Sequence, residues 1–164
     1  MNYPNKYYKI KDKAHNTYYF NFRGNLSRIK DKNGNELKII YKDADSGNDL
    51  LDRSRISQII DGAGHKYTFK YYVKSSTGVE LDYVESITDD AKRKIAFDIS
   101  NGLLRKVSYY DDNEATFEYQ INSNDPTDRR INAVYSNGIY GLGFVYTSLE
   151  TGRRVKKVTE YGES

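Results

Sequence analysis

The sequence predicts an all-β fold in which consecutive antiparallel β-hairpins form a twisted sheet that curls into an arc or open shell. Three observations support this prediction. The hydrophobic residues are mostly strand-forming types, among them 17 Tyr and 6 Phe. Hydrophobic residues recur at fixed offsets in successive segments and alternate there with polar ones, at the period of a β-strand. Gly and Asn, which tolerate the backbone of tight turns, lie between these segments.

The composition excludes several classes of protein. The chain of 164 residues has no Cys, which excludes a disulfide-stabilised scaffold and a cysteine-based zinc site. Its 26 basic and 23 acidic residues nearly balance, so the strongly basic surface of a nucleic-acid-binding protein is absent. No stretch approaches the roughly 18 consecutive apolar residues of a membrane span, and residues 1–16 lack the apolar core of a signal peptide. We therefore expect no nucleic-acid partner and no membrane insertion.

The repeat is defined by seven anchor residues and by hydrophobic positions at fixed offsets from them. The anchors are Ile10, Ile29, Ile59, Ile87, Val107, Val134 and Val158. A hydrophobic residue lies three positions before each anchor, and others lie eight, ten and twelve positions after the first six. The offsets of eight, ten and twelve place three side chains on one face of a strand. The offset of three is odd, so a bulge or a bend is needed for that residue to share the face of its anchor.

Each unit of the repeat is predicted to be one hairpin. The turns fall at segments such as Asp31–Gly34 and Asp61–Gly64. The hairpins begin near residues 7, 26, 56, 84, 104 and 131, a last strand begins near residue 155, and residues 1–164 are assigned to a single domain. The connections between hairpins vary in length. At Val79, Leu81 and Tyr83 the alternation continues into one of them, which predicts a strand that runs past the shared positions.

Two segments resemble the YD repeat of RHS and teneurin-type proteins, whose units read approximately Tyr-x-Tyr-Asp-x-x-Gly-Arg-Leu-x-x-Val-x-Asp-x-x-Gly. They are residues 19–34, YFNFRGNLSRIKDKNG, and residues 55–71, RISQIIDGAGHKYTFKY. Later units depart from the pattern. Asp89 keeps the Asp that follows the anchor, whereas Tyr109 and Ser136 replace it, and the turn Gly is missing around Lys92 and Asp112.

The resemblance implies a segment of a large secreted or surface protein, as in bacterial RHS proteins and cell-wall-associated proteins of Gram-positive bacteria. In that family successive hairpins build a shell that encloses a C-terminal toxin or presents an adhesive surface, and the repeats are not known for catalysis. We therefore expect an extracellular or cell-wall location and a non-catalytic scaffold whose partner is the remainder of a larger parent protein. The alternative is a module that binds a glycan or a surface protein, and a hydrolase is a remote one.

The most specific candidate metal site is a run of alternating carboxylates between two predicted hairpins. Calcium takes several oxygen ligands, which this run supplies from Asp43, Asp45, Asp49 and Asp52. The register of an EF-hand fails, because Gly47, Asn48 and Ser54 stand where a ligand, the turn Gly and the bidentate Glu belong. A site of another type stays open, and the turn-forming residues favour a solvated acidic loop.

No set of residues predicts catalysis or a cofactor. His15 and His65 are the only histidines, both lie in predicted turns, and neither is near a nucleophile elbow. Carboxylate pairs of the glycosidase type stay open, since sequence gives no separations. We predict no catalytic residues.

Two aromatic features bear on binding. In residues 66–74, KYTFKYYVK, period two places the apolar residues on the face of the repeat and the Lys residues on the other, which disfavours single-stranded nucleic acid. Five tyrosines lie outside the repeat positions and are expected to be exposed, where they offer rings for stacking on sugars: Tyr72, Tyr109, Tyr110, Tyr135 and Tyr140. The strand edges of such an array also predict edge-to-edge pairing between copies.

Overall fold

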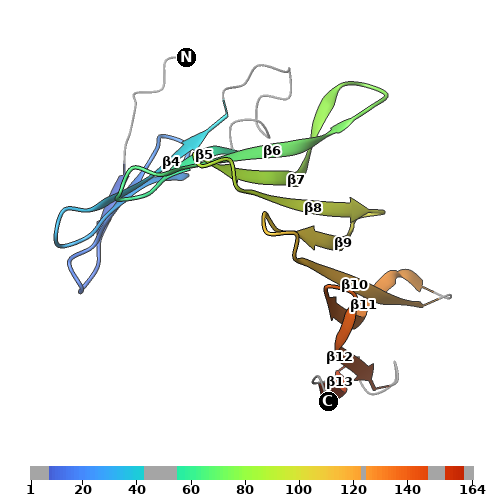
Figure 1. The fold of residues 1–164 in the computed structure, drawn as a ribbon. Helices are drawn as coiled ribbons and strands as arrows, with labels where there is room; N and C mark the ends of the chain where they lie inside the picture. Colours follow the sequence, from blue (N-terminus) through green and yellow to red (C-terminus); the bar gives the residue numbers. More distant parts are fainter. Residues whose placement is uncertain (1–7, 43–54, 123–124, 148–153, 161–164) are drawn as a thin grey trace. The chain divides into compact units, whose positions relative to one another are not determined.

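The computed structural model describes residues 8–42, 55–122, 125–147 and 154–160, and in these ranges every regular element is a β-strand. None of the described segments is a helix of the length and hydropathy that a membrane crossing needs. Thirteen strands follow one another in a sheet whose spatial order is the sequence order, β1 to β13. Within each compact unit described below, neighbouring strands pair antiparallel. The prediction of an all-β chain of consecutive antiparallel hairpins in an open sheet is therefore confirmed (Figure 1).

The chain divides into two compact units, Met1–Lys94 and Ile95–Ser164, which are described one at a time. The first contains β1 (Tyr8–Lys11), β2 (Thr17–Phe20), β3 (Leu26–Lys30), β4 (Glu36–Tyr41), β5 (Ile56–Ile60), β6 (Lys66–Lys74) and β7 (Val79–Asp89). The strands of the second are β8 (Lys94–Ser100), which begins at the boundary, β9 (Leu103–Ser108), β10 (Glu114–Asn122), β11 (Asp125–Ser136), β12 (Ile139–Tyr146) and β13 (Val155–Glu160). The predicted hairpin starts match these strands, except that β7 and β11 begin earlier and that residue 7 lies outside the described residues.

The long strands form hairpin arms beyond the shared repeat positions. In the first unit β6 and β7 run side by side, pairing from Tyr67–Asp89 to Lys74–Val79 (Figure 1). This arm confirms the extended strand that the alternation around Val79 predicts. Strands β10 and β11 of the second unit pair in the same way from Ala115–Ser136 to Asn122–Asp125.

A turn stabilised by one carboxylate closes several hairpins. In the turn after β3, the backbone N–H groups of Asn33 and Asn35 donate to Asp31 Oδ1 at 2.8 and 2.9 Å, and Asn35 Nδ2 donates to Asp31 Oδ2 at 2.7 Å. The fourth of the five turn residues has a positive φ. In this turn it is Gly34, which adopts a φ of 94° without a steric cost. The same arrangement recurs around Asp12, Asp61 and Asp89.

The odd offset of three is explained by a β-bulge that recurs at one position of the repeat. Ile40 pairs with Gln58 but the next residue, Tyr41, pairs with Ile56, so Ser57 is left over. The residues skipped in this way stand two positions before their anchors and are Ser27, Ser57, Glu85, Arg105, Asn132 and Lys156. The extra residue brings the position three before the anchor onto the anchor's face.

The repeat positions make a half-covered surface in each unit. Among the described residues, the only hydrophobic residues classed as buried are Tyr71, Leu103, Val107 and Ala133. Ile29, Leu37 and Phe69 are half-buried, while the anchors of the end strands, Ile10 and Val158, are 58% and 53% exposed. Apolar side chains on a single sheet are expected to stay partly exposed, because no second layer covers the face on which they lie.

Four tyrosines at the offset of twelve close the bases of their hairpins, and we call them the clamp tyrosines. Strands β3 and β4 pair only near the turn, from Arg28–Lys38 to Lys30–Glu36, and the Tyr41 hydroxyl donates to the Leu26 carbonyl at 2.8 Å below this ladder. The other clamp tyrosines do the same at 2.7 to 2.9 Å: Tyr71 to Ile56, Tyr119 to Leu104 and Tyr146 to Ile131. Each acceptor residue lies beyond the end of the ladder of its own hairpin, so the hydroxyl holds the two strands together where that ladder has stopped.

Candidate functional site

The best-organised cluster of charged side chains lies at the base of the connection between β4 and β5. The Lys42 N–H donates to the Arg55 carbonyl at 2.9 Å, so the chain leaves and returns to the sheet at this pair. Residues 43–54 of the connection lie outside the described residues. The cluster consists of Lys42 and Arg55 with three residues of neighbouring strands: Tyr71, Glu80 and Asp82.

Arg55 is the centre of this cluster. Its side chain is only 7% exposed, and its Nη2 donates to Asp82 Oδ1 at 3.0 Å and to the Glu80 carbonyl at 3.1 Å. Its Nη1 lies 3.5 Å from Glu80 Oε2, and Lys42 Nζ donates to both oxygens of the same carboxylate. A buried guanidinium is costly unless it is paired and hydrogen-bonded, and here both conditions are met.

An aromatic ring completes the cluster. Lys42 Nζ and Arg55 Cζ lie 5.3 and 5.6 Å from the centre of the Tyr71 ring, within the range of cation–π attraction. Burial raises the pKa of the Tyr71 hydroxyl above its ordinary value. The hydroxyl is therefore protonated at neutral pH and donates to the Ile56 carbonyl. Among the described residues the cluster brings two cations together with two carboxylates, which suits it to holding Lys42 and Arg55 against β7.

The second unit holds a smaller version of this arrangement. Arg130 stands four residues before its anchor, as Arg55 does, and its Cζ lies 5.0 Å from the ring centre of Tyr146. Arg130 Nε forms an ion pair with Asp128 Oδ1 at 3.2 Å without hydrogen-bond geometry. Arg130 Nη2 donates to Asp128 Oδ2 at 3.3 Å. Neither arginine is among the site residues that the sequence predicts. The signal that identifies them is an Arg directly before the apolar position that starts the hairpin.

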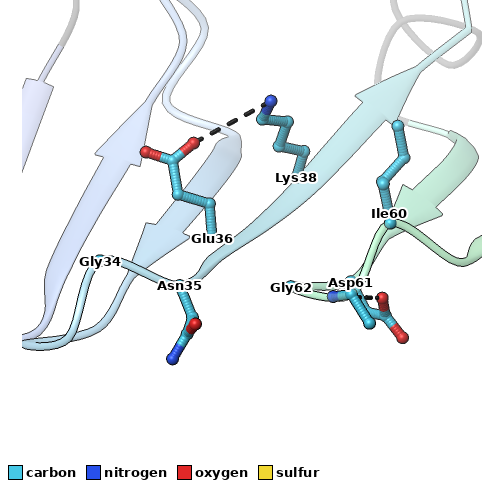
Figure 2. Close-up of a pocket in the computed structure, with 9 residues that line it drawn as sticks. Gly34, Asn35, Glu36, Lys38, Ile60, Asp61 and Gly62 are labelled. Atoms are coloured by element: carbon cyan, nitrogen blue, oxygen red, sulfur yellow. Dashed lines mark hydrogen bonds and ion pairs between the residues drawn. The ribbon is translucent and has the colours of Figure 1, made fainter.

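An open cleft of about 460 Å³ lies between the β3–β4 and β5–β6 turns, and it holds two carboxylates. In Figure 2 the Glu36 carboxylate is directed toward Lys38, while Asp61 points into its own turn. The hydrogen bond from the His65 side chain holds the pKa of Asp61 below its ordinary value, and backbone N–H groups act in the same direction. A glycosidase needs one carboxylic acid with a raised pKa, and the lowered pKa of Asp61 does not suit it to that role.

The residues considered for a metal site and for catalysis fall into two groups. The calcium candidates Asp43, Asp45, Asp49 and Asp52 all lie outside the described residues. In the described part of the chain, no group of three or more His, Cys, Asp or Glu side chains is placed to hold a metal ion. His15 and His65 both lie in exposed hairpin turns, where the sequence predicts them.

The five tyrosines outside the repeat positions are not equally exposed. Tyr109 and Tyr110 are 42% and 60% exposed, as predicted. Tyr72 is half-buried, and so are Tyr135 and Tyr140, whose rings pack edge to face with centres 5.1 Å apart. The prediction of exposure is therefore right for the adjacent pair Tyr109 and Tyr110 and wrong for the other three.

The alternation of residues 66–74 is confirmed for most of its length. Tyr67 and Phe69 are half-buried and Tyr71 is buried, while Lys66 and Lys70 are exposed, and Lys70 Nζ pairs with Glu85 at 2.9 Å. Val73 is 51% exposed because the ladder between β6 and β7 is irregular beyond Tyr71.

Comparison with known proteins adds no identification. The sequence matches no model of a known protein family, and it matches no curated protein.

Proposed function

We propose that the chain is a non-catalytic structural segment, a repeating hairpin scaffold or wall of a larger secreted or surface protein. One observation carries this proposal. The same β-bulge and the same tyrosine clamp recur in successive hairpins of each unit. Each hairpin therefore stabilises itself and its neighbour by local contacts, which is how repeat scaffolds are built.

The residues behind the YD-repeat resemblance have defined structural roles, which supports a scaffold built from repeats of that type. The Asp and Gly after the anchor are Asp31 and Gly34 in one segment, and they form the carboxylate-stabilised turn. The Arg and Tyr of the other segment are Arg55 and Tyr71, which form the charged cluster and the clamp. All of these roles maintain the fold and none presents a reactive group.

Surface labelling tests the proposed location and role. An antibody raised against the purified chain is applied to intact and to lysed cells of the source organism, with an antibody against a cytoplasmic protein as the control. We expect the chain to be labelled, and removed by added protease, on intact cells. Labelling that requires lysis, as it does for the control, would contradict the surface role.

A binding module is the second candidate, favoured by the two consecutive exposed residues Tyr109 and Tyr110. They are 42% and 60% exposed in the turn between β9 and β10, and exposed rings stack on sugars. A glycan array tests it with Tyr110→Ala as the variant and Tyr83→Ala, at a residue 44% exposed in the other unit, as the control. Signals lost only in Tyr110→Ala would favour binding over a purely structural role, and an array without hits would count against it.

A further inference from the structure

The polar face of the first unit carries an uneven share of the basic residues. Residues 8–42 contain nine Lys and Arg but three Asp and Glu, although the whole chain has 26 and 23. Residues that lie opposite each other on neighbouring strands share a face of the sheet. Successive pairs form two rows across the polar face, which we call the basic rows: Lys9, Tyr19, Arg28, Lys38, Ile60 and Lys66 in the first, and Lys11, Thr17, Lys30 and Glu36 in the second.

Glu36 balances only a part of the charge in these rows. Its carboxylate oxygens lie 3.4 Å from Arg28 Nη1, 3.6 Å from Lys30 Nζ and 4.0 Å from Lys38 Nζ. One carboxylate therefore lies among three cations, whose side chains are 38%, 44% and 56% exposed. Arg28 and Lys38 also lie directly opposite each other, and like charges in such a pair are destabilising. An anion from outside the chain would relieve this repulsion.

The second unit balances the equivalent position within its own sheet. Lys106 stands directly before its anchor, as Arg28 does, and it lies opposite the carboxylate residue Asp98. The residues opposite Arg28 are Tyr19 and Lys38, and neither is acidic. The repeat itself therefore does not require the excess of cations in the basic rows.

The length of the first row and the cleft beside it indicate the form of the anion. Neighbouring strands are about 4.8 Å apart, so a row across β1 to β6 is about 24 Å long and suits an extended polymer. Lys38 and Ile60 of this row also line the open cleft of about 460 Å³, a volume within the range of small-ligand sites. Asn35 and Glu36 line the same cleft, and Figure 2 shows the Glu36 carboxylate directed toward Lys38. Amide and carboxylate oxygens accept hydrogen bonds from hydroxyl groups, which a sugar ring carries.

The aromatic content of the basic rows disfavours a nucleic acid. Proteins that bind single strands stack the bases on exposed rings. Tyr19 is the one aromatic residue of the two rows; it is half-buried, and Arg28 Cζ lies 3.9 Å from the centre of its ring. The Arg28 guanidinium therefore already covers one side of this ring. A carboxylate in the cleft, Glu36, also repels phosphate groups, whereas it accepts a hydrogen bond from a sugar hydroxyl.

We propose that the basic rows bind a linear anionic polysaccharide. Its carboxylate or sulfate groups lie along Lys9, Arg28 and Lys38, and one sugar ring occupies the cleft, where its hydroxyls donate to Asn35 and Glu36. This site lies in the first unit and is separate from the exposed tyrosines of the second. The proposal rests on the charge of this face and not on the scaffold role, so either can fail without the other.

Binding of labelled oligosaccharides to the full chain tests the proposal. The probes are fluorescent octasaccharides of heparin and of polygalacturonate, followed by fluorescence anisotropy at physiological ionic strength. We expect saturable binding of at least one octasaccharide, weaker binding as salt is added, and weaker binding of the corresponding disaccharide, which is too short to span the first row. No saturable binding of either octasaccharide, or equal affinity for the disaccharide, would overturn the proposal.

Variants of the protein test the position of the site. Lys38→Gln is expected to weaken binding roughly two- to fivefold, and the double variant Lys9→Gln with Lys38→Gln roughly tenfold, because these residues are three strands apart and act independently. Lys70→Gln is the matched control, since Lys70 lies in β6 of the same unit and is 66% exposed but pairs with Glu85 at 2.9 Å. It should bind as the parent does. Equal losses in Lys38→Gln and Lys70→Gln would overturn the assignment to the basic rows.

Two further measurements distinguish a polysaccharide site from a general polyanion site. Ala63 lines the cleft, and Ala63→Leu fills part of it without a change of charge. This variant should weaken octasaccharide binding and leave the binding of inorganic polyphosphate unchanged, and an unchanged octasaccharide affinity would overturn the placement of the sugar ring. Single-stranded oligothymidylate of equal charge should bind more weakly than the octasaccharide, and tighter binding would mean that this face takes a nucleic acid instead.

Discussion

Removing one hydroxyl from a clamp tyrosine should destabilise its hairpin measurably. Tyr71 is 5% exposed, and its hydroxyl donates to the Ile56 carbonyl at 2.9 Å. In Tyr71→Phe the ring stays in place beside Lys42 and Arg55, so the change isolates the hydrogen bond. Loss of a bond of this kind costs about 0.5–1.5 kcal/mol, and a carbonyl left without a donor in a half-buried place adds to it. We expect the free energy of unfolding to fall by about 1–2 kcal/mol.

Urea unfolding followed by circular dichroism measures this change, with Tyr109→Phe as the matched control. Tyr109 is 42% exposed, so its variant should differ from the parent by less than about 0.5 kcal/mol. Tyr41→Phe and Tyr119→Phe lie in different units and should each cost about 1 kcal/mol, with additive effects in the double variant. If Tyr71→Phe and Tyr109→Phe unfold at the same urea concentration, the clamp does not stabilise the hairpin and the reasoning is refuted.

Three further predictions concern the turns. Gly34→Ala places a side chain at φ of 94° and should cost about 1 kcal/mol in urea unfolding, whereas a variant of equal stability would mean that this turn relaxes freely. Hydrogen bonds from Asn16 and Asn35 lower the pKa values of Asp12 and Asp31 from 3.8 in the folded state. The stabilisation from these contacts is therefore present above pH 3.8 and is lost as pH falls below it. In a variant with both Asp residues changed to Asn, the free energy of unfolding should fall less steeply as the pH is lowered. The hydrogen bond that the His65 ring donates to Asp61 raises the pKa of His65 above 6.5. The stabilisation from this contact is therefore complete below pH 6.5 and is lost as pH rises through the folded value. Nuclear magnetic resonance titration measures that value, and an ordinary pKa of His65 would contradict the contact.

The hairpins were predictable from sequence because strand period and fixed offsets are local properties. Ile29 and Leu37 are eight residues apart, and they lie opposite each other as that offset requires. One register was not predictable. In the first connection the anchor Ile29 pairs with Tyr18, whereas Ile59 pairs with Ile39, a residue at the offset of ten from its own anchor. The short loop after Phe20 shifts the pairing by two residues, and loop geometry of this kind is not encoded in the apolar pattern.

The candidate site was less predictable because it depends on pairs from distant strands. The Arg55 guanidinium meets Asp82, a residue 27 positions later, only once β5, β6 and β7 are aligned. The clamp tyrosines were more predictable than the charged cluster but less predictable than the hairpins. Tyr abundance at the apolar positions indicated that the hydroxyl needs a polar neighbour, but its acceptor is a backbone carbonyl 15 residues away that carries no sequence signal.

The half-covered apolar surface explains why successive hairpins repeat the same polar contacts. A single sheet gives its side chains no second layer, and the few hydrophobic residues that are buried in the described ranges contribute less than a closed core would. Stability must then come from contacts that recur in several hairpins: a carboxylate that accepts turn N–H groups, a bulge that aligns the apolar positions, and a hydroxyl that closes the base. These contacts are local, so their loss in one hairpin should lower stability by a similar amount wherever it occurs. The clamp variants in the two units test this directly, since a scaffold of this type should respond to Tyr41→Phe and Tyr119→Phe alike.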